Sequence, residues 1–404
     1  MKKFLVILAV VIVLGLAGGA VYLFVFAGYT IGDVELRDPD LDNRFGFLGG
    51  GPTLVPFELS EMNETGAGWV RPHPGPFIWG SMQPSADAEI DFRDSDKMMR
   101  LANKHGLSVL VTLWPYAEWD QQTRADSADC DVGFVEFSEE FGNFRCVPND
   151  WQAYEAWVTA VVERYDGDGI DDMSGLGVKI KHWEASNEPD LNYRAKAEPG
   201  SEDKFVPGVE SRPDDSNLTF FEGEPEEYAE LLKRTYKAVK AADQSAQVLI
   251  AGSAGGSDDS AAFYRKIFSD PGVLQSFDIA NVHCISSDDV QSFNVEPYNK
   301  LLQEFKITAP VWVTEAEAFI AKDDQVNATQ VEASSRKAFR LGAERIFYTS
   351  RNFEAPPGID IPIKIDEMWK FIPPPDRELE GATDDPIGTY QIIFTALQEA
   401  AAAQ

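Results

Sequence analysis

The chain has 404 residues, 44% of them hydrophobic, and carries a formal net charge of −32. This length and apolar content suit one large cored domain or two average domains. The acidity argues against a nucleic-acid partner, whose phosphates would be repelled. It is compatible both with a high-salt habitat and with an ordinary extracellular surface.

The first 28 residues predict a membrane anchor. Lys2 and Lys3 precede a run from Phe4 to Gly28 that contains no charged residue. A run of this length can span a bilayer as a helix, and the two lysines place the N-terminus in the cytoplasm. A cleaved signal peptide is the alternative, because residues 17–20 are small, but the apolar run continues past them. We expect an uncleaved single-pass anchor, residues 1–28, with the rest of the chain outside the cytoplasm.

Residues 29–44 are polar and rich in aspartate, which predicts a linker, and residues 45–404 read as one domain. In that domain short apolar runs alternate with amphipathic ones. The runs that predict strands are 45–52, 66–72, 107–113, a run from 178, 247–252, 277–284, a run from 311, and 345–349. The runs that predict helices are 95–105, 151–165, 224–242, 260–268, 295–305, 330–341 and 388–401.

This alternation predicts an α/β protein, a (β/α)8 TIM barrel preceded by the transmembrane helix. An open doubly wound sheet is the rival, but no glycine-rich phosphate loop follows the first strand. Two long loops, 191–221 and 350–386, are rich in Pro, Gly and Asp. Loops of that length in a compact domain are usually functional or disordered.

Two of the three cysteines, Cys130 and Cys146, lie close together in a polar region beyond the expected anchor. Export favours a disulfide between them, worth about 3 kcal/mol in the chain-entropy model; two free thiols are the alternative. No Cys/His spacing resembles a zinc site, and the first strand has no His-x-His pattern. We therefore expect no metal and no cofactor.

Two predicted strands end in a glutamate. The strand that begins at Val178 reaches Glu188, and Pro189 must end it because proline cannot donate to a ladder. The strand that begins at Val311 reaches Glu315. Buried carboxylates are costly unless they are paired or used, and the strand C-termini of a barrel carry its active site. The sequence therefore predicts two carboxylates at one end of the sheet.

These strand ends carry a resemblance. The stretch Trp183-Glu184-x-x-Asn187-Glu188-Pro189 resembles the fourth-strand motif of the retaining glycoside hydrolases of clan A, and Val313-Thr314-Glu315 resembles their seventh-strand motif. The chain is most similar in this respect to families 5 and 39. The resemblance implies that Glu188 is the acid/base and Glu315 the nucleophile of a double displacement. Glu317 is a rival nucleophile, and two salt-bridged structural glutamates are the simpler alternative.

The resemblance also implies residues that bind the sugar or orient the pair. Asn187 would hydrogen-bond the 2-hydroxyl, and Arg71 would hold the nucleophile ionised. His283 ends the sixth strand, where the family often has a histidine or tyrosine. A surface ion pair for Arg71 and a core position for His283 are the alternatives.

Aromatic residues near the predicted strand ends are candidates for the sugar subsite. The family's eighth strand usually ends in a tryptophan, which this chain lacks, so Tyr348 is the substitute. Trp114 follows the third strand and could face the sugar, although such residues often pack in the core. Altogether the sequence predicts a membrane-anchored, extracytoplasmic retaining glycosidase with a carbohydrate substrate. A catalytically silent carbohydrate-binding barrel is the alternative.

Overall fold

The computed structural model describes residues 35–49, 59, 62–135, 137–191, 193, 219–255, 258–284, 294–316, 324–349 and 394, and of 324–331 the backbone only. The expected anchor 1–28, the helix expected at 388–401 except residue 394, and most of loops 191–221 and 350–386 lie outside these residues. Glu317 lies outside them as well. Within the described ranges, every helix is too short or too polar to cross a membrane.

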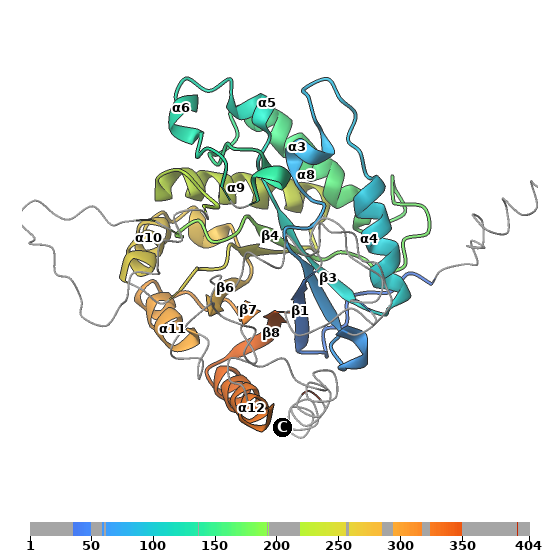
Figure 1. Ribbon diagram of the computed structural model, residues 1–404, viewed down its shortest axis with the longest axis vertical. Coiled ribbons are helices and arrows are strands. Elements are labelled where there is room, and N and C mark those ends of the chain that lie inside the picture. The colour runs from blue at the N-terminus through green and yellow to red at the C-terminus, as the bar shows by residue number, and fades with distance from the viewer. Residues whose placement is uncertain are drawn as a thin grey trace, which may run out of the picture. The chain divides into compact units, whose positions relative to one another are not determined.

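Eight parallel strands form the centre of the described part of the chain (Figure 1). They are β1 Phe45–Gly49, β2 Trp69–Pro72, β3 Ser108–Leu113, β4 His182–Ala185, β5 Gln247–Ile250, β6 Ala280–Cys284, β7 Val311–Ala316 and β8 Ala343–Thr349. Their order is β5-β4-β3-β2-β1-β8-β7-β6. Parallel bridges from Leu249 to Ile279 and from Ser253 to Val282 connect the two ends of this order. The strands therefore close into the predicted (β/α)8 barrel.

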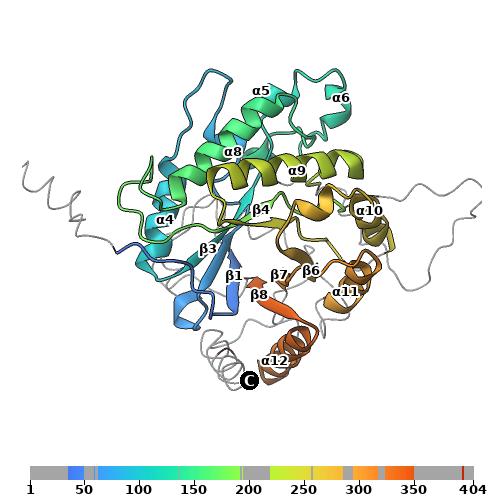
Figure 2. The same ribbon diagram turned by 180° about the vertical axis from the view of Figure 1, so that it is seen from behind.

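Helices surround the strands, as Figures 1 and 2 show from opposite sides. The larger ones are α4 Arg93–Lys104, α8 Trp151–Tyr165, α9 Pro225–Ala242, α10 Asp258–Phe268, α11 Val295–Glu304 and α12 Asp324–Arg340. Short helices occupy the loops: α3 Trp79–Met82, α5 Glu118–Gln121, α6 Ser127–Cys130, α7 Ser138–Phe141 and the 3₁₀ turn η1 Val273–Gln275. Each larger helix buries an apolar face against the outside of the barrel.

Local sequence explains where the longest helices begin. Asp150 accepts a hydrogen bond from the backbone N–H of Ala153 and so caps α8. Glu224 and Glu227 form a capping box at α9, and Pro225 occupies the first turn, where its missing N–H costs nothing.

Two elements start four or more residues away from the predicted position. The fourth strand begins at His182 and not at Val178, because Val178 instead forms a parallel bridge with Arg37. The last described helix begins at Asp324 and not at residue 330, since no proline or glycine interrupts 324–340.

The barrel interior has an apolar floor. Inward-facing residues of several strands pack together there: Trp69, Leu110, Leu249, Ile279, Trp312 and Phe347. Arg345 lies between two of these rings, 4.3 Å from the centroid of Trp69 and 4.3 Å from that of Trp312. Its guanidinium donates to the backbone carbonyls of Leu41 and Asn43. Residues directly before β1 thus contact this floor.

Candidate active site

Above the floor, Arg71 on β2 joins three side chains from three parts of the barrel. Its Nε donates to Glu184 Oε2 at 2.8 Å and its Nη1 to Glu315 Oε1 at 2.6 Å. Its Nη2 donates to Asn187 Oδ1 at 2.6 Å. Arg71 and Glu184 are fully buried, so the exposed ion pair considered as an alternative for Arg71 is wrong.

Glu184 on β4 connects the polar layer, which consists of the buried side chains of Arg71, Thr112, Glu184 and Asn281 above the apolar floor. Thr112 Oγ1 donates to its Oε2 at 2.6 Å, and Asn281 Nδ2 donates to its Oε1 at 2.6 Å. Arg71 balances its charge, with Nη2 2.7 Å from the same Oε2 to which Thr112 donates. A buried carboxylate with this many partners is satisfied.

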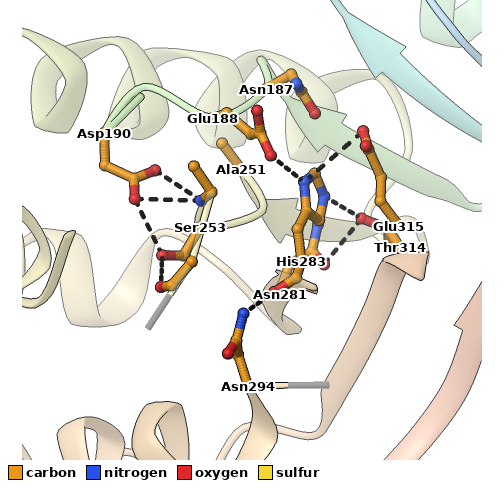
Figure 3. Close-up of polar contacts among 12 residues, drawn as sticks. Asn187, Glu188, Asp190, Ala251, Ser253, Asn281, His283, Asn294, Thr314 and Glu315 are labelled. Atoms are coloured by element: carbon orange, nitrogen blue, oxygen red, sulfur yellow. Dashed lines mark hydrogen bonds and ion pairs between the residues drawn. The ribbon is translucent and has the colours of Figure 1, made fainter. Parts of the chain in front are cut away.

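Glu188 lies in a tight turn after β4. Its φ is 37°, and Ser186 two residues earlier has φ 68°. Non-glycine residues in this region cost about 1–3 kcal/mol each and occur where surrounding contacts enforce them. Asp190 provides such contacts, because its carboxylate accepts from Ser253 Oγ at 3.1 Å and from the N–H of Ala254 at 3.0 Å. The turn that presents Glu188 is therefore tied to the segment after β5 (Figure 3).

A register shift in β7 brings two consecutive residues to the site. Val282 pairs with Val313 and His283 with Glu315, which leaves Thr314 as an extra residue on β7. A bulge of this kind breaks the alternation of faces and re-aims side chains. Both Thr314 and Glu315 consequently contact His283 or its neighbours in the interior.

His283 lies between the two glutamates at the strand ends (Figure 3). Its Nδ1 is 2.9 Å from Glu188 Oε1 and 3.7 Å from Glu315 Oε1. One carboxylate oxygen of Glu188 and one of Glu315 lie within 4.8 Å of each other. All three side chains are buried.

The electrostatic surroundings differ between the charged groups. Burial raises the pKa of the Glu315 carboxyl, as does nearby Glu188, while His283 and Arg71 oppose the rise. Burial lowers the pKa of His283 below its ordinary value, and Arg71 adds to that effect. For Arg71, burial acts to lower the pKa, but Glu184 and Glu315 together raise it.

Two groups of side chains in the described ranges have oxygens or nitrogens close enough together to ligate a metal. One is Glu188, His283 and Glu315; the other is Asp166, Asp168 and Asp172 in the loop after α8. In the first group, Glu315 Oε1 already accepts from the Arg71 guanidinium at 2.6 Å. A divalent cation on that oxygen would face this fixed positive charge, which favours a metal-free role for the first group.

The sequence-predicted residues divide into two sets. Arg71, Asn187, Glu188, His283 and Glu315 lie together as one contact network. Trp114 lies one layer behind: it is buried, its Nε1 donates to Pro74 O at 2.7 Å, and its ring is 5.4 Å from that of His73. His73 in turn has its Nδ1 3.9 Å from Glu315 Oε1.

Tyr348 does not belong to the site, so its prediction as a sugar-binding residue is wrong. Phe347 faces the barrel interior, and strand alternation therefore turns Tyr348 outward. Its hydroxyl shares a hydrogen bond with Ser335 of α12, and its ring stacks on Phe394 at 5.7 Å.

Cys130 and Cys146 form a disulfide with a Cα–Cα distance of 5.2 Å. It closes the segment that contains Phe137 and Phe141. Phe137 lies 5.7 Å from the ring of His73, and Phe141 lies 4.4 Å from that of Trp114. The disulfide thus closes the loop that lies behind His73.

Sequence reasoning missed several polar residues of this network, among them Asn281, Thr314 and Asp190. Asn281 could have been found, because it precedes His283 by two positions and so shares its face of β6. Thr314 could not, because alternation would turn it away from Glu315 and only the bulge brings both inward.

No protein-family model matches the sequence, and no curated protein matches it. Among solved structures, the chain is similar to a glucosidase from Croceicoccus marinus, with 16% identity over 88% of this chain and a TM-score of 0.57. It is also similar to a family 39 glycoside hydrolase from Bacteroides cellulosilyticus (14%, 90%, 0.53) and to a family 39 enzyme from Xanthomonas axonopodis pv. citri (15%, 78%, 0.50). The matches cover 68%, 66% and 61% of those chains. The resemblance to clan A barrels is thereby confirmed at the level of fold: this chain has the (β/α)8 barrel that these glycoside hydrolases share.

Proposed function

We propose that the protein is a retaining glycoside hydrolase that cleaves O-glycosidic bonds. The observation that carries the proposal is the pair of buried glutamates at the ends of β4 and β7, with carboxylate oxygens within 4.8 Å of each other. Retaining enzymes place their two carboxyl groups about 5 to 5.5 Å apart, whereas inverting enzymes need about 6.5 to 9.5 Å to admit a water. An oxygen of each carboxylate within 4.8 Å of the other is compatible with the retaining arrangement, which supports double displacement.

The contacts of each glutamate support different roles. Glu315 accepts a charge-assisted hydrogen bond from Arg71, as a nucleophile that must stay ionised requires. Glu188 faces the imidazole of His283, as expected of a group that gives and takes a proton. Glu315 attacks the anomeric carbon while Glu188 protonates the departing oxygen. Glu188 then removes a proton from water, which attacks the same carbon and frees Glu315.

Asn187 supplies a donor for the substrate. Its Oδ1 is held by Arg71, so its Nδ2 points elsewhere, and that atom is buried with no partner among the described residues. A sugar hydroxyl would satisfy it, and the 2-hydroxyl is our candidate because its hydrogen bonds strengthen in the transition state. The glucosidase and family 39 glycoside hydrolases of similar fold are consistent with a glycoside substrate.

The test is turnover of a panel of aryl glycosides with good and poor leaving groups. Glu315→Ala should abolish turnover of every substrate. Glu188→Ala should keep activity on the good leaving groups, which need no protonation, and azide should restore more by attacking the glycosyl-enzyme. Sugar binding without turnover by the unaltered chain would instead support the silent carbohydrate-binding barrel.

We also propose that this barrel is held outside the cytoplasm by an N-terminal anchor. The support is the uncharged run from Phe4 to Gly28 behind Lys2 and Lys3. Full-length protein should stay in the membrane fraction after a high-salt wash. A soluble mature protein whose N-terminus lies near Val21 or Gly28 would show that the segment is a cleaved signal peptide.

A further inference from the structure

Hydrogen counting along one chain of side chains assigns the proton of His283. This series of hydrogen-bonded side chains runs from Glu184 through Asn281 and Thr314 to His283 and ends at Glu188 (Figure 3 shows its last four members). Every member is buried, and its partners lie within hydrogen-bond distance. Each group has a fixed number of hydrogens, so the donor in one hydrogen bond determines the donor in the next.

The first link fixes the amide of Asn281. Glu184 is ion-paired with Arg71, and an ionised carboxylate can only accept. The amide atom 2.6 Å from Glu184 Oε1 must therefore be the donor Nδ2. The opposite orientation would place Oδ1 against a carboxylate oxygen, two acceptors with no hydrogen between them. The Oδ1 of Asn281 consequently faces Thr314.

The second link uses the only hydrogen of the Thr314 hydroxyl. Thr314 Oγ1 lies 2.9 Å from Asn281 Oδ1, and the amide oxygen has no hydrogen to give, so Thr314 donates. At the same time Thr314 Oγ1 lies 2.8 Å from His283 Nε2. With its hydrogen already used, the hydroxyl can only accept there. The imidazole must therefore carry a hydrogen on Nε2.

The last link concerns Nδ1 and Glu188. Burial favours the neutral imidazole, and a neutral ring with its hydrogen on Nε2 has a bare Nδ1. That nitrogen lies 2.9 Å from Glu188 Oε1, a distance that two lone pairs cannot share without a hydrogen. The hydrogen must then belong to Glu188.

We propose that Asn281 and Thr314 are positioning residues that keep the hydrogen of His283 on Nε2, so that the bare Nδ1 holds Glu188 in its protonated form. The assignment to Nε2 follows from the contacts alone; the benefit for a general acid rests on the proposed glycosidase function. A bare nitrogen facing Glu188 disfavours the ionised carboxylate, so Glu188 stays protonated to higher pH.

Other charged and titratable groups also face this imidazole. Glu315 on β7 is 3.7 Å from Nδ1, and Arg71, Glu184 and Asp190 act on it electrostatically from β2, β4 and the turn after β4. His73 after β2 is a further neighbour. These charges do not select the tautomer, because among the described residues the hydrogen-bond partner of Nε2 is the Thr314 hydroxyl.

Close packing keeps the ring in this pose. A Cβ on Gly252, two residues after β5, would lie 2.0 Å from His283 Nε2. Real Cβ atoms do not approach that closely, so only glycine leaves room for the ring at its present position.

The experiment is nuclear magnetic resonance of the full-length chain labelled with ¹⁵N on histidine. The chain has four histidines, and a His283→Gln variant assigns the signal. We expect a protonated Nε2 and an unprotonated Nδ1 at neutral pH. A hydrogen on Nδ1 with a bare Nε2, or an imidazolium with both nitrogens protonated, would overturn the proposal. This readout does not depend on turnover, so it can succeed or fail separately from the glycosidase assignment.

Variants connect the tautomer to chemistry. Thr314→Val removes the acceptor of Nε2, so the ring can move its hydrogen to Nδ1 and stabilise ionised Glu188. The alkaline limb of kcat/KM should then move to lower pH, with about a tenfold loss on poor leaving groups and little loss on good ones. Thr314→Ser should restore both. Thr112→Val is the matched control, because it removes a hydroxyl from the same Glu184 carboxylate without contacting His283; an equal shift in the control would contradict the proposal.

Discussion

Asp190 offers a test of the turn that presents Glu188. Its carboxyl is buried, and burial raises its pKa from an ordinary 3.8 to about 6. Asp190→Asn replaces the carboxyl by a neutral group of the same shape. The amide oxygen can still accept from the N–H of Ala254. The new NH2 can donate to Ser253 Oγ, whose own hydrogen can go to Gly255 O. The variant should therefore keep the turn intact.

Because the folded state raises the pKa of Asp190, this carboxyl lowers the stability of the fold as the pH rises. Below about pH 4 both the folded and the unfolded chain hold the Asp190 proton, so this group costs nothing. Between about pH 4 and 6 the unfolded chain loses the proton first, and the folded state of the wild type is progressively destabilised. Above about pH 6 the cost is constant, and the two pKa values correspond to about 3 kcal/mol. The amide of the Asp190→Asn variant does not titrate, so the variant carries no such cost.

The assay is thermal unfolding of the wild type and Asp190→Asn at pH 4 and pH 7. The variant should gain roughly 2 to 3 kcal/mol on the wild type between these values, which for a chain of this length is roughly 3 °C in Tm. Asp87→Asn is the control, because it replaces an exposed aspartate outside the turn that presents Glu188. A difference between Asp190→Asn and wild type that does not change with pH would refute the reasoning.

Three further changes probe the same region. Arg71→Met leaves buried carboxylates unpaired and should cost about 3–5 kcal/mol in chemical denaturation; because Arg71 lowers the pKa of Glu315, the acidic limb of kcat/KM should move to higher pH. Gly252→Ala should displace His283 and lower kcat about 10²-fold in steady-state kinetics, with little change in overall circular dichroism. Cys146→Ser should lower stability by about 3 kcal/mol, measured by thermal unfolding without reductant.

The fold could be predicted because apolar runs, which predict strands, alternate along the sequence with amphipathic runs, which predict helices. All eight expected strands overlap those of the structure. The boundaries were less accurate where tertiary contacts decide them. Val178 has the composition of a strand residue, but it pairs with Arg37, a residue far away in the sequence. No local pattern contains that partner.

The candidate site was predictable only in part. Glu188 could be located because Pro189 cannot donate to a strand ladder, so the strand has to end before it, and β4 does end at Ala185. Tyr348 was misplaced because its face of β8 depends on register, and a shift of one residue exchanges the two faces. Thr314 was missed because the bulge in β7 has no glycine or proline to mark it.

Stability does not explain the polar layer above the apolar floor. Replacing a buried ion pair by well-packed apolar residues is often neutral or stabilising, so Arg71 and Glu184 do not strengthen the barrel by being charged. Their contacts instead determine orientation: Arg71 aims Glu315 and Asn187, and Glu184 orients Asn281. The floor of Trp69, Trp312 and Phe347 shows that this interior also accommodates apolar residues. In one layer, directly below two glutamates, this barrel has buried polar side chains in place of apolar packing. That is the layer in which the proposed chemistry needs fixed charges and fixed hydrogen positions.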